Sequence, residues 1–215
     1  FGGEHGHPTT DHLSAIYYNP AGLSLGKGTR LTIDANLALR LFSYERPIEA
    51  LDNALAEGET GAGTPADAVS SNTGKATLTN FIAAPFMAVA SDFGIEGFSA
   101  ALGFYAPFGG SSVYDKTENL VDYPGAVDGP QRWWAIEGTI RSIYFTGAAA
   151  YTFKPLKLSV GLGLNAVKSE VYTVRARNSN GTDNVSREGR ALLDVEGIEL
   201  SLGLGVIWEP QDGLY

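Results

Sequence analysis

Apolar and polar residues alternate along this chain in stretches of similar length. In the first stretch one parity is apolar and the other is polar or small, with Leu31, Ile33, Ala35, Leu37, Leu39 and Leu41 set against Thr32, Asp34, Asn36, Ala38 and Arg40. The same alternation returns over residues 98–108, 143–153, 156–166 and 198–208. Because successive side chains of a β-strand point to opposite faces, each stretch predicts a strand with one apolar face.

Residues 81–91 form a sixth apolar stretch with a different pattern. Both parities are apolar, and Pro85 lies in the middle. Proline has no N–H to donate to a sheet ladder, so this is the weakest of the six predicted strands.

The apolar positions of one stretch form a stripe along one face of the strand, and the length of these stripes indicates the kind of sheet. Each covers about 11 residues, the length that a tilted strand needs to cross a bilayer, whereas strands of soluble proteins usually have about 5–6 residues. Polar and charged residues such as Lys168, Glu170, Asp194 and Glu196 continue two of the stretches. We therefore predict an all-β fold, a transmembrane antiparallel β-barrel with six strands and the start of a seventh at Leu214.

The connections alternate in length, which agrees with that fold. Residues 42–79, 107–138 and 176–190 are predicted as long extracellular loops, whereas 92–96, 154–155 and 209–213 are short. Outer-membrane barrels have short periplasmic turns and longer outer loops. Within the first loop, Ile48, Leu51, Ala54 and Leu55 have helical spacing and predict a short helix over 47–59. The alternative is a soluble β-sandwich, whose strands are shorter and whose loops lack this rhythm.

Composition excludes several classes of protein. The net charge is −9 and the 15 Lys and Arg residues are scattered, which disfavours a nucleic-acid partner. No cysteine is present, so the chain has no disulfide and no thiolate nucleophile. The longest apolar run, residues 81–90, is too short for a membrane-spanning helix.

Histidine is confined to one stretch, at His5, His7 and His12. With Glu4 and Asp11 these imidazoles could bind Zn²⁺, Cu²⁺ or Ni²⁺, but the spacing matches no defined site, and a flexible segment lining a plug is the alternative. We assign neither a metal nor a cofactor. A hydrolase would need a nucleophile beside a base, and no Gly-X-Ser-X-Gly occurs, so we expect no enzyme.

The string Tyr-Tyr-Asn-Pro-Ala-Gly-Leu at residues 17–23 resembles the hatch motif of the FadL-type outer-membrane transport proteins, which carry long-chain fatty acids and aromatic hydrocarbons. Residues 2–6 are similar to the N-terminus of some members. The resemblance implies a fourteen-stranded barrel plugged by an N-terminal hatch, and this chain would cover its N-terminal half. It also implies ligand capture at the outer loops and sideways release at an inward kink of the third strand.

On this resemblance, residues 1–27 are the hatch and residues 28–215 the N-terminal part of the barrel. Asn19, Pro20, Ala21 and Gly22 are the candidate gate. Proline fixes φ, glycine permits positive φ and asparagine bonds its own backbone, so this turn could hold a plug and still move. The alternative is an ordinary turn before the first strand. We expect the polar inner face to hold the plug through Asp34, Asn36, Arg40, Ser99 and Glu199.

Two further sets of candidates follow. The strand that matches the kinked third strand is 97–107, where Gly103 or Pro107 could permit a kink. The loop 107–138 is rich in aromatic residues, so Phe108, Trp133 and Trp134, together with Tyr105, are candidate ligand-binding residues. The alternative is that the aromatic residues pack the loop onto the barrel rim.

These observations favour passive uptake of hydrophobic small molecules across a bacterial outer membrane. The expected partners are the ligand, outer-membrane lipid, lipopolysaccharide and the C-terminal remainder of the barrel, with the protein monomeric. Two alternatives stay open. One is a structural or adhesion barrel without transport, and the other is a soluble β-sandwich binding module.

Overall fold

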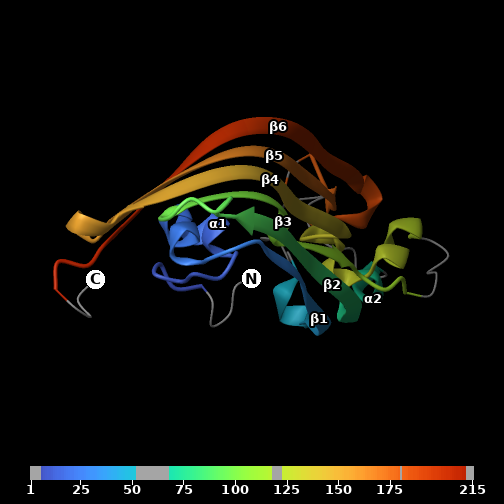
Figure 1. Ribbon diagram of the computed structural model, residues 1–215. Helices are drawn as coiled ribbons and strands as arrows, with labels where there is room; N and C mark the ends of the chain where they lie inside the picture. The colour runs from blue at the N-terminus through green and yellow to red at the C-terminus, as the bar shows by residue number, and fades with distance from the viewer. Residues whose placement is uncertain (1–5, 52–67, 118–122, 180, 212–215) are drawn as a thin grey trace.

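Six long strands make up a single antiparallel sheet in the part of the chain that the computed structural model describes, residues 6–51, 68–117, 123–179 and 181–211. Their spatial order is their order in the chain: β1 (Arg30–Arg46), β2 (Gly74–Ser91), β3 (Phe98–Val113), β4 (Glu137–Phe153), β5 (Leu158–Arg177) and β6 (Gly189–Trp208). The sheet curves strongly, and the N-terminal segment with α1 (Ala15–Tyr18) lies under its concave face (Figure 1).

The remaining helices are short. They are η2 (Pro20–Leu25), η3 (Ile48–Ala50), α2 (Val69–Asn72), η5 (Pro124–Asp128), η6 (Pro130–Trp133), η7 (Lys154–Leu156) and η8 (Val185–Arg187). Of the helix predicted over 47–59, η3 covers three residues, and positions 52–59 lie outside the described residues, as does Leu214. No helix in the described ranges combines the length and the apolar character needed to cross a membrane.

The strands occur where the alternation predicts them, but they are longer than the apolar stripes. The predicted loop bounds 42–79, 107–138 and 176–190 are therefore wrong. The first connection runs from Arg46 to Gly74, the second from Val113 to Glu137 and the third from Arg177 to Gly189. The reason is that ladder bonds join backbone groups, so pairing continues where the side chains have become polar.

Residues 81–91 form part of strand β2, as predicted, and Pro85 does not interrupt its pairing with β1. β2 pairs with β1 without interruption from Arg30↔Ala90 to Arg46↔Gly74. Both parities are apolar because both faces of β2 meet apolar surroundings. Phe86, Ala88 and Ala90 pack on the N-terminal segment, whereas Met87 and Val89 lie on the convex face.

The predicted assignment of faces is confirmed, except in β3 after Tyr105. The apolar stripes are exposed on the convex face, with Leu202 70% and Leu204 81% exposed. The small and polar parities of β3 and β4, such as Ser99, Ala101, Ala148 and Ala150, are buried on the concave side. A continuous apolar surface of this extent is typical of a protein that contacts a membrane or a partner.

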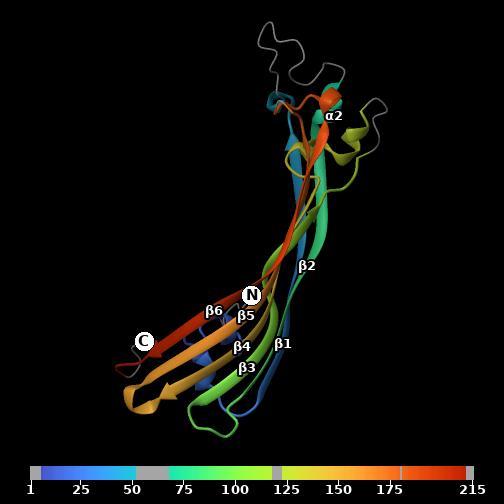
Figure 2. The same ribbon diagram turned by 90° about the horizontal axis from the view of Figure 1, so that it is seen from above.

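Short turns and long loops lie at opposite ends of the sheet. The turn between β4 and β5 lies at one end, and α2 with the other loop helices lies at the far end (Figure 2). The N-terminal segment packs at the end with the short turns, so the loop end of the concave face is not covered by it.

Candidate functional site

The N-terminal segment, residues 6–28, is bound to the concave face by an apolar core. Leu13, Ile16 and Leu23 are buried and pack against side chains of β2, β3 and β4. The partners from the sheet are Phe86, Ala88, Ala90, Ala101, Tyr105, Ala148 and Ala150. Small residues on the sheet let the segment approach closely, which explains why the inner parity of these strands is rich in alanine.

The Asn-Pro-Ala turn touches the last strand of the sheet. Asn19 is the N-cap of η2, and its side-chain oxygen accepts a hydrogen bond from Ala21 N at 3.2 Å. The same amide donates from Nδ2 to Pro8 O at 2.9 Å and to Val206 O at 3.1 Å. Pro20 takes the first helical position, where a missing N–H costs nothing. One side chain therefore caps the helix and ties the turn to β6.

Two glycines of the sheet make room for this turn. A Cβ atom on Gly205 would overlap Asn19 Oδ1 and would lie 2.8 Å from Ala21 N. A Cβ atom on Gly161 of β5 would overlap Ala21 N and would lie 2.7 Å from Pro20 O. Gly161 and Gly205 are paired across β5 and β6, so together they form a socket that fits the turn.

Other contacts hold the C-terminal end of η2 and the chain before α1. Arg30 donates to Leu23 O at 2.9 Å and to Asp11 O, and Ser24 Oγ bonds Thr152 Oγ1 at 2.8 Å. The polar residues expected to hold the plug do other things. Asp34 accepts a hydrogen bond from Ala35 N, and Arg40 bonds groups of β2 and β3. The Ser99 hydroxyl is buried and has no hydrogen-bond partner among the described residues. Asn36 and Glu199 are exposed.

The sheet has a gap between β2 and β3. The two strands pair only from Ser91↔Ala100 to Phe86↔Tyr105, although both continue well beyond. At the same level, the pairing of β3 with β4 shifts between Tyr105 and Phe108. An extra residue in one strand bends it and interrupts the ladder. Pro107, one of the two residues predicted to permit a kink, lies in this bulge.

Gly103 is the other candidate for the kink. It pairs regularly with Ala88 of β2 and Thr146 of β4, so the irregularity does not lie at Gly103. Its lack of a side chain has a different use. A Cβ atom there would lie 3.0 Å from Ile16 Cδ1, so Gly103 accommodates the N-terminal segment.

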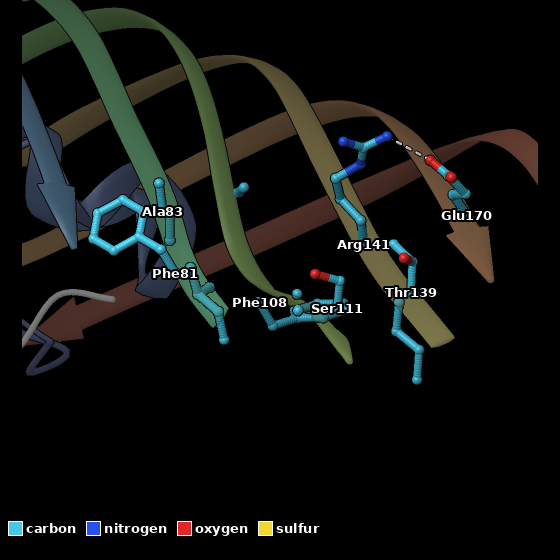
Figure 3. Close-up of a pocket in the computed structure, with 13 residues that line it drawn as sticks. Phe81, Ala83, Phe108, Ser111, Thr139, Arg141 and Glu170 are labelled. Carbon is cyan, nitrogen blue, oxygen red and sulfur yellow. Dashed lines mark hydrogen bonds and ion pairs between the residues drawn. The ribbon is translucent and has the colours of Figure 1, made fainter. Parts of the chain in front are cut away.

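A cavity of about 420 Å³ opens at the gap (Figure 3). Its walls come from β2, β3 and β4, with one residue of β5: Phe81, Ile82, Ala83, Ala84, Ala106, Phe108, Gly109, Gly110, Ser111, Thr139, Ile140, Arg141 and Glu170. Residues of both parities of β2 contribute to this lining. The Arg141–Glu170 ion pair, at 2.5 Å, borders it.

Phe108 lies in this cavity and is 49% exposed. The alternation placed it on the outer stripe with Phe104, which is wrong. The bulge sets Phe108 opposite Ser142, whose side chain is buried on the concave side. Directly paired residues share a face, so one extra residue reverses the parity of everything that follows it in β3.

The gap is bridged at its loop end by side chains. Arg40 Nη2 donates to Ser111 O at 2.6 Å and to Ser112 Oγ at 2.7 Å, and Arg40 Nε donates to Asn80 Oδ1 at 3.2 Å. Asn80 also donates to Ser111 O. Further along, Asp115 N donates to Thr77 O at 2.9 Å. The opening is therefore a window with closed ends.

Aromatic rings form the other end of the window. Tyr105 stacks on Tyr144 with centroids 5.4 Å apart, and Tyr17 meets both rings edge-on at 5.7 and 5.9 Å. The Tyr105 hydroxyl bonds Thr146 Oγ1 at 2.7 Å. Tyr105 is completely buried, so in this arrangement it packs beneath the N-terminal segment and is not placed to bind a ligand as expected.

The loop end is organised by Arg132, which sequence reasoning missed. This side chain is fully buried and donates to Ser71 O at 2.6 Å, to Asn72 Oδ1 at 2.6 Å and to Glu188 Oε1 at 3.0 Å. It thus joins three separate connections. The sequence did offer a signal for this role: Arg132 lies directly before two tryptophans, in a chain with few basic residues.

The two tryptophans beside Arg132 are placed differently. Trp133 Nε1 donates to Asn72 Oδ1 at 2.8 Å, and its ring lies 5.2 Å from the Arg132 guanidinium. Trp134 is 73% exposed. Two cavities, of about 410 and 380 Å³, lie here and share Arg46, Trp133 and Arg175. Trp133 thus has a packing role beside both cavities, whereas the exposed Trp134 lines the larger of the two.

The histidines that the structure describes bond nearby hydroxyl groups. His7 Nδ1 lies 3.2 Å from Thr9 Oγ1, and His12 Nδ1 lies 3.0 Å from Ser14 Oγ. His5 lies outside the described residues. Among the residues that are described, histidine, aspartate and glutamate form no cluster of three suited to a metal ion.

Comparison with known proteins adds one finding. No family model and no curated protein matches this sequence. Among solved structures, the crystal structure of a Pseudomonas aeruginosa FadL homologue is similar, with a TM-score of 0.52 and 18% sequence identity. The match covers 96% of this chain and 46% of that one, so this chain spans about half the length of the similar structure. At this identity the likeness shows a FadL-like β-barrel fold.

Proposed function

We propose that this chain forms part of an outer-membrane channel for passive uptake of hydrophobic small molecules, either fatty acids or aromatic hydrocarbons. The observation that carries the proposal is the window between β2 and β3. It opens in a sheet whose convex face is apolar, and its apolar lining of Phe81, Ile82, Ala83 and Phe108 lies beside the polar Ser111, Thr139 and Arg141–Glu170 pair. A molecule on the concave side could leave into lipid along the apolar part of this lining.

The N-terminal segment fits the role of a hatch in this route. It packs on the concave face at the end with the short turns, where it would block passage straight through a closed barrel. Asn19, Pro20, Ala21 and Gly22 would be its gate, seated in the socket of Gly161 and Gly205. A ligand arriving from the loop end would meet the hatch and turn sideways to the window.

The loop end would capture the ligand. Trp134 is exposed there, and the cavities beside Trp133 combine aromatic and cationic walls. The proposed partners are the ligand, outer-membrane lipid, lipopolysaccharide and the remaining strands of a barrel that acts as a monomer. Spontaneous partition of an apolar ligand into lipid supplies the driving force, so no energy source is needed.

Filling the window tests the proposal. Ala84→Trp places a large side chain in the cavity, whereas Ala35→Trp places the same side chain on the exposed convex face of β1 and serves as the control. The full-length protein is produced in cells that lack their own uptake channel. Uptake of a labelled fatty acid and of an alkylbenzene is normalised to folded protein, measured by heat-modifiable migration.

We expect Ala84→Trp to lower uptake of both ligands at least tenfold and Ala35→Trp to leave it unchanged. Equal uptake by the two variants would contradict release through the window. The hatch is tested separately with Asn19→Asp, which keeps the acceptor for Ala21 N but cannot donate to Pro8 O or Val206 O. Transport at the wild-type rate would contradict the gate.

A further inference from the structure

We propose that Arg40 is a latch on the window, and that a ligand with an anionic head group opens it by replacing Ser111 and Ser112 on the guanidinium. This inference rests on the proposed function and assigns a specificity-determining residue to it.

The latch takes the place of missing backbone bonds. Beyond Phe86↔Tyr105, no ladder pair joins β2 to β3 in the described strands. Arg40 reaches from β1 past Asn80 of β2 to Ser111 O and Ser112 Oγ of β3. Ser111 also lines the cavity. The width of the window at this end therefore depends on bonds from two side chains, those of Arg40 and Asn80.

The charges around Arg40 leave it suited to an anion. All of its acceptors are neutral: a carbonyl, a hydroxyl and an amide oxygen. Within the described residues, no carboxylate forms an ion pair with it. Arg141, the other cation at the cavity, is already paired with Glu170 at 2.5 Å. Hydrogen bonds between a guanidinium and a carboxylate are about twice as strong as bonds to neutral acceptors.

The cavity indicates the rest of the ligand. Its apolar walls include Phe81 and Ile82, which follow Asn80 in β2, and Phe108 of β3. A molecule that satisfies both parts has one anionic group and an apolar tail. When its head group takes Arg40, the two bonds from Arg40 to β3 are released, and beside the cavity only the bond from Asn80 to Ser111 O still joins the described parts of β2 and β3. A neutral ligand has no charge with which to replace Ser111 and Ser112 on the Arg40 guanidinium, so it leaves these bonds in place.

The test compares two ligands of equal chain length, dodecanoate and dodecanol, in the full-length protein in the outer membrane. Arg40→Gln removes the charge, and Arg40→Lys keeps the charge but loses the planar fork. Lys75→Gln is the control, because it removes one positive charge from β2 at a position outside the cavity lining. Uptake of each ligand is normalised to folded protein.

We expect wild type to favour dodecanoate. Arg40→Gln should lower dodecanoate uptake on the order of tenfold, the equivalent of one charged hydrogen bond, while dodecanol uptake stays equal or rises because the latch is open. Arg40→Lys should keep part of the preference, and Lys75→Gln should keep all of it. If Arg40→Gln leaves the ratio of the two ligands unchanged, or Lys75→Gln alters it equally, the latch is refuted. If wild type takes up neither ligand, the proposed function itself fails.

Discussion

Gly205 of β6 and Asn19 of the N-terminal segment lie so close together that a single methyl group on Gly205 would overlap the Asn19 side-chain oxygen. Asn19 also donates to the backbone of the next residue, Val206, at 3.1 Å. The fit of the turn into the sheet thus depends on a missing side chain as much as on a hydrogen bond.

Gly205→Ala should displace the Asn-Pro-Ala turn from its socket. Gly203→Ala is the matched control on the same strand and face, because a Cβ atom there would meet only Gly163 O at 4.0 Å. Since the chain has no cysteine, Tyr18→Cys provides a unique label. We expect maleimide to react faster with Tyr18→Cys when Gly205→Ala is present. The same rate in both backgrounds would show that the turn does not depend on the socket.

A charge on the convex face should destabilise the protein in a membrane. Leu202→Arg is expected to cost about 2–4 kcal/mol of folding free energy, the usual penalty for a lipid-facing arginine near the bilayer centre. Ser201→Arg, one residue away on the concave side, should cost much less. Folding titrations of the full-length protein into lipid vesicles measure both. Equal penalties would mean that the convex face does not contact lipid.

Substitution of Trp133 and of Trp134 should differ in the effect on loop stability. Trp134→Ala removes an exposed ring and should weaken binding of a hydrophobic ligand without changing the loops. Trp133→Ala removes the bond to Asn72 and should also make the loops more sensitive to protease. Ligand-dependent quenching of tryptophan fluorescence measures affinity. Unchanged affinity in Trp134→Ala would give the loop aromatics a purely structural role.

Loss of Arg132 should loosen three connections at once. Arg132→Ala leaves Arg190 as the remaining cation on the largely buried Glu188 carboxylate, so the loss should stay below the penalty of about 3–5 kcal/mol for a buried charge with no partner. Arg132→Lys keeps the charge but cannot reach Ser71, Asn72 and Glu188 together. Limited proteolysis should cut both variants in residues 68–73, 123–136 and 181–188 faster than wild type. The control is Arg141→Ala, which breaks a more exposed ion pair, and this variant should be cleaved at the wild-type rate.

The loop end should also weaken in acid. Burial of Asp128 opposes its ionisation, but hydrogen bonds from Lys116 and Arg190 outweigh it and hold the pKa of this carboxyl below its usual value. A lowered pKa in the folded state stabilises that state above the ordinary carboxyl pKa of about 3.9 and loses its effect as the pH falls through the folded value. Protease sensitivity of the loops should therefore rise below about pH 4. Asp128→Asn should remove this acid-dependent step.

The sequence by itself determined where the strands lie and which face of each is apolar. Alternation records the face on which a side chain lies, and that is a local property of a strand. It therefore identified the stripes of β1 and β6, and the Tyr-Tyr-Asn-Pro-Ala-Gly-Leu string indicated the family resemblance.

The tertiary structure decided everything that depends on a partner strand. The gap beside β3 exists because β2 and β3 stop pairing at Phe86 and Tyr105, next to Pro85 and Pro107. The two prolines are visible in the sequence, but only the pairing of the strands shows that a gap opens there. One extra residue in the bulge reversed the face of Phe108. Tyr105 became buried because the N-terminal segment covers it. Arg40 and Arg132 acquired their roles because long side chains bond groups that the fold brings together from distant parts of the chain.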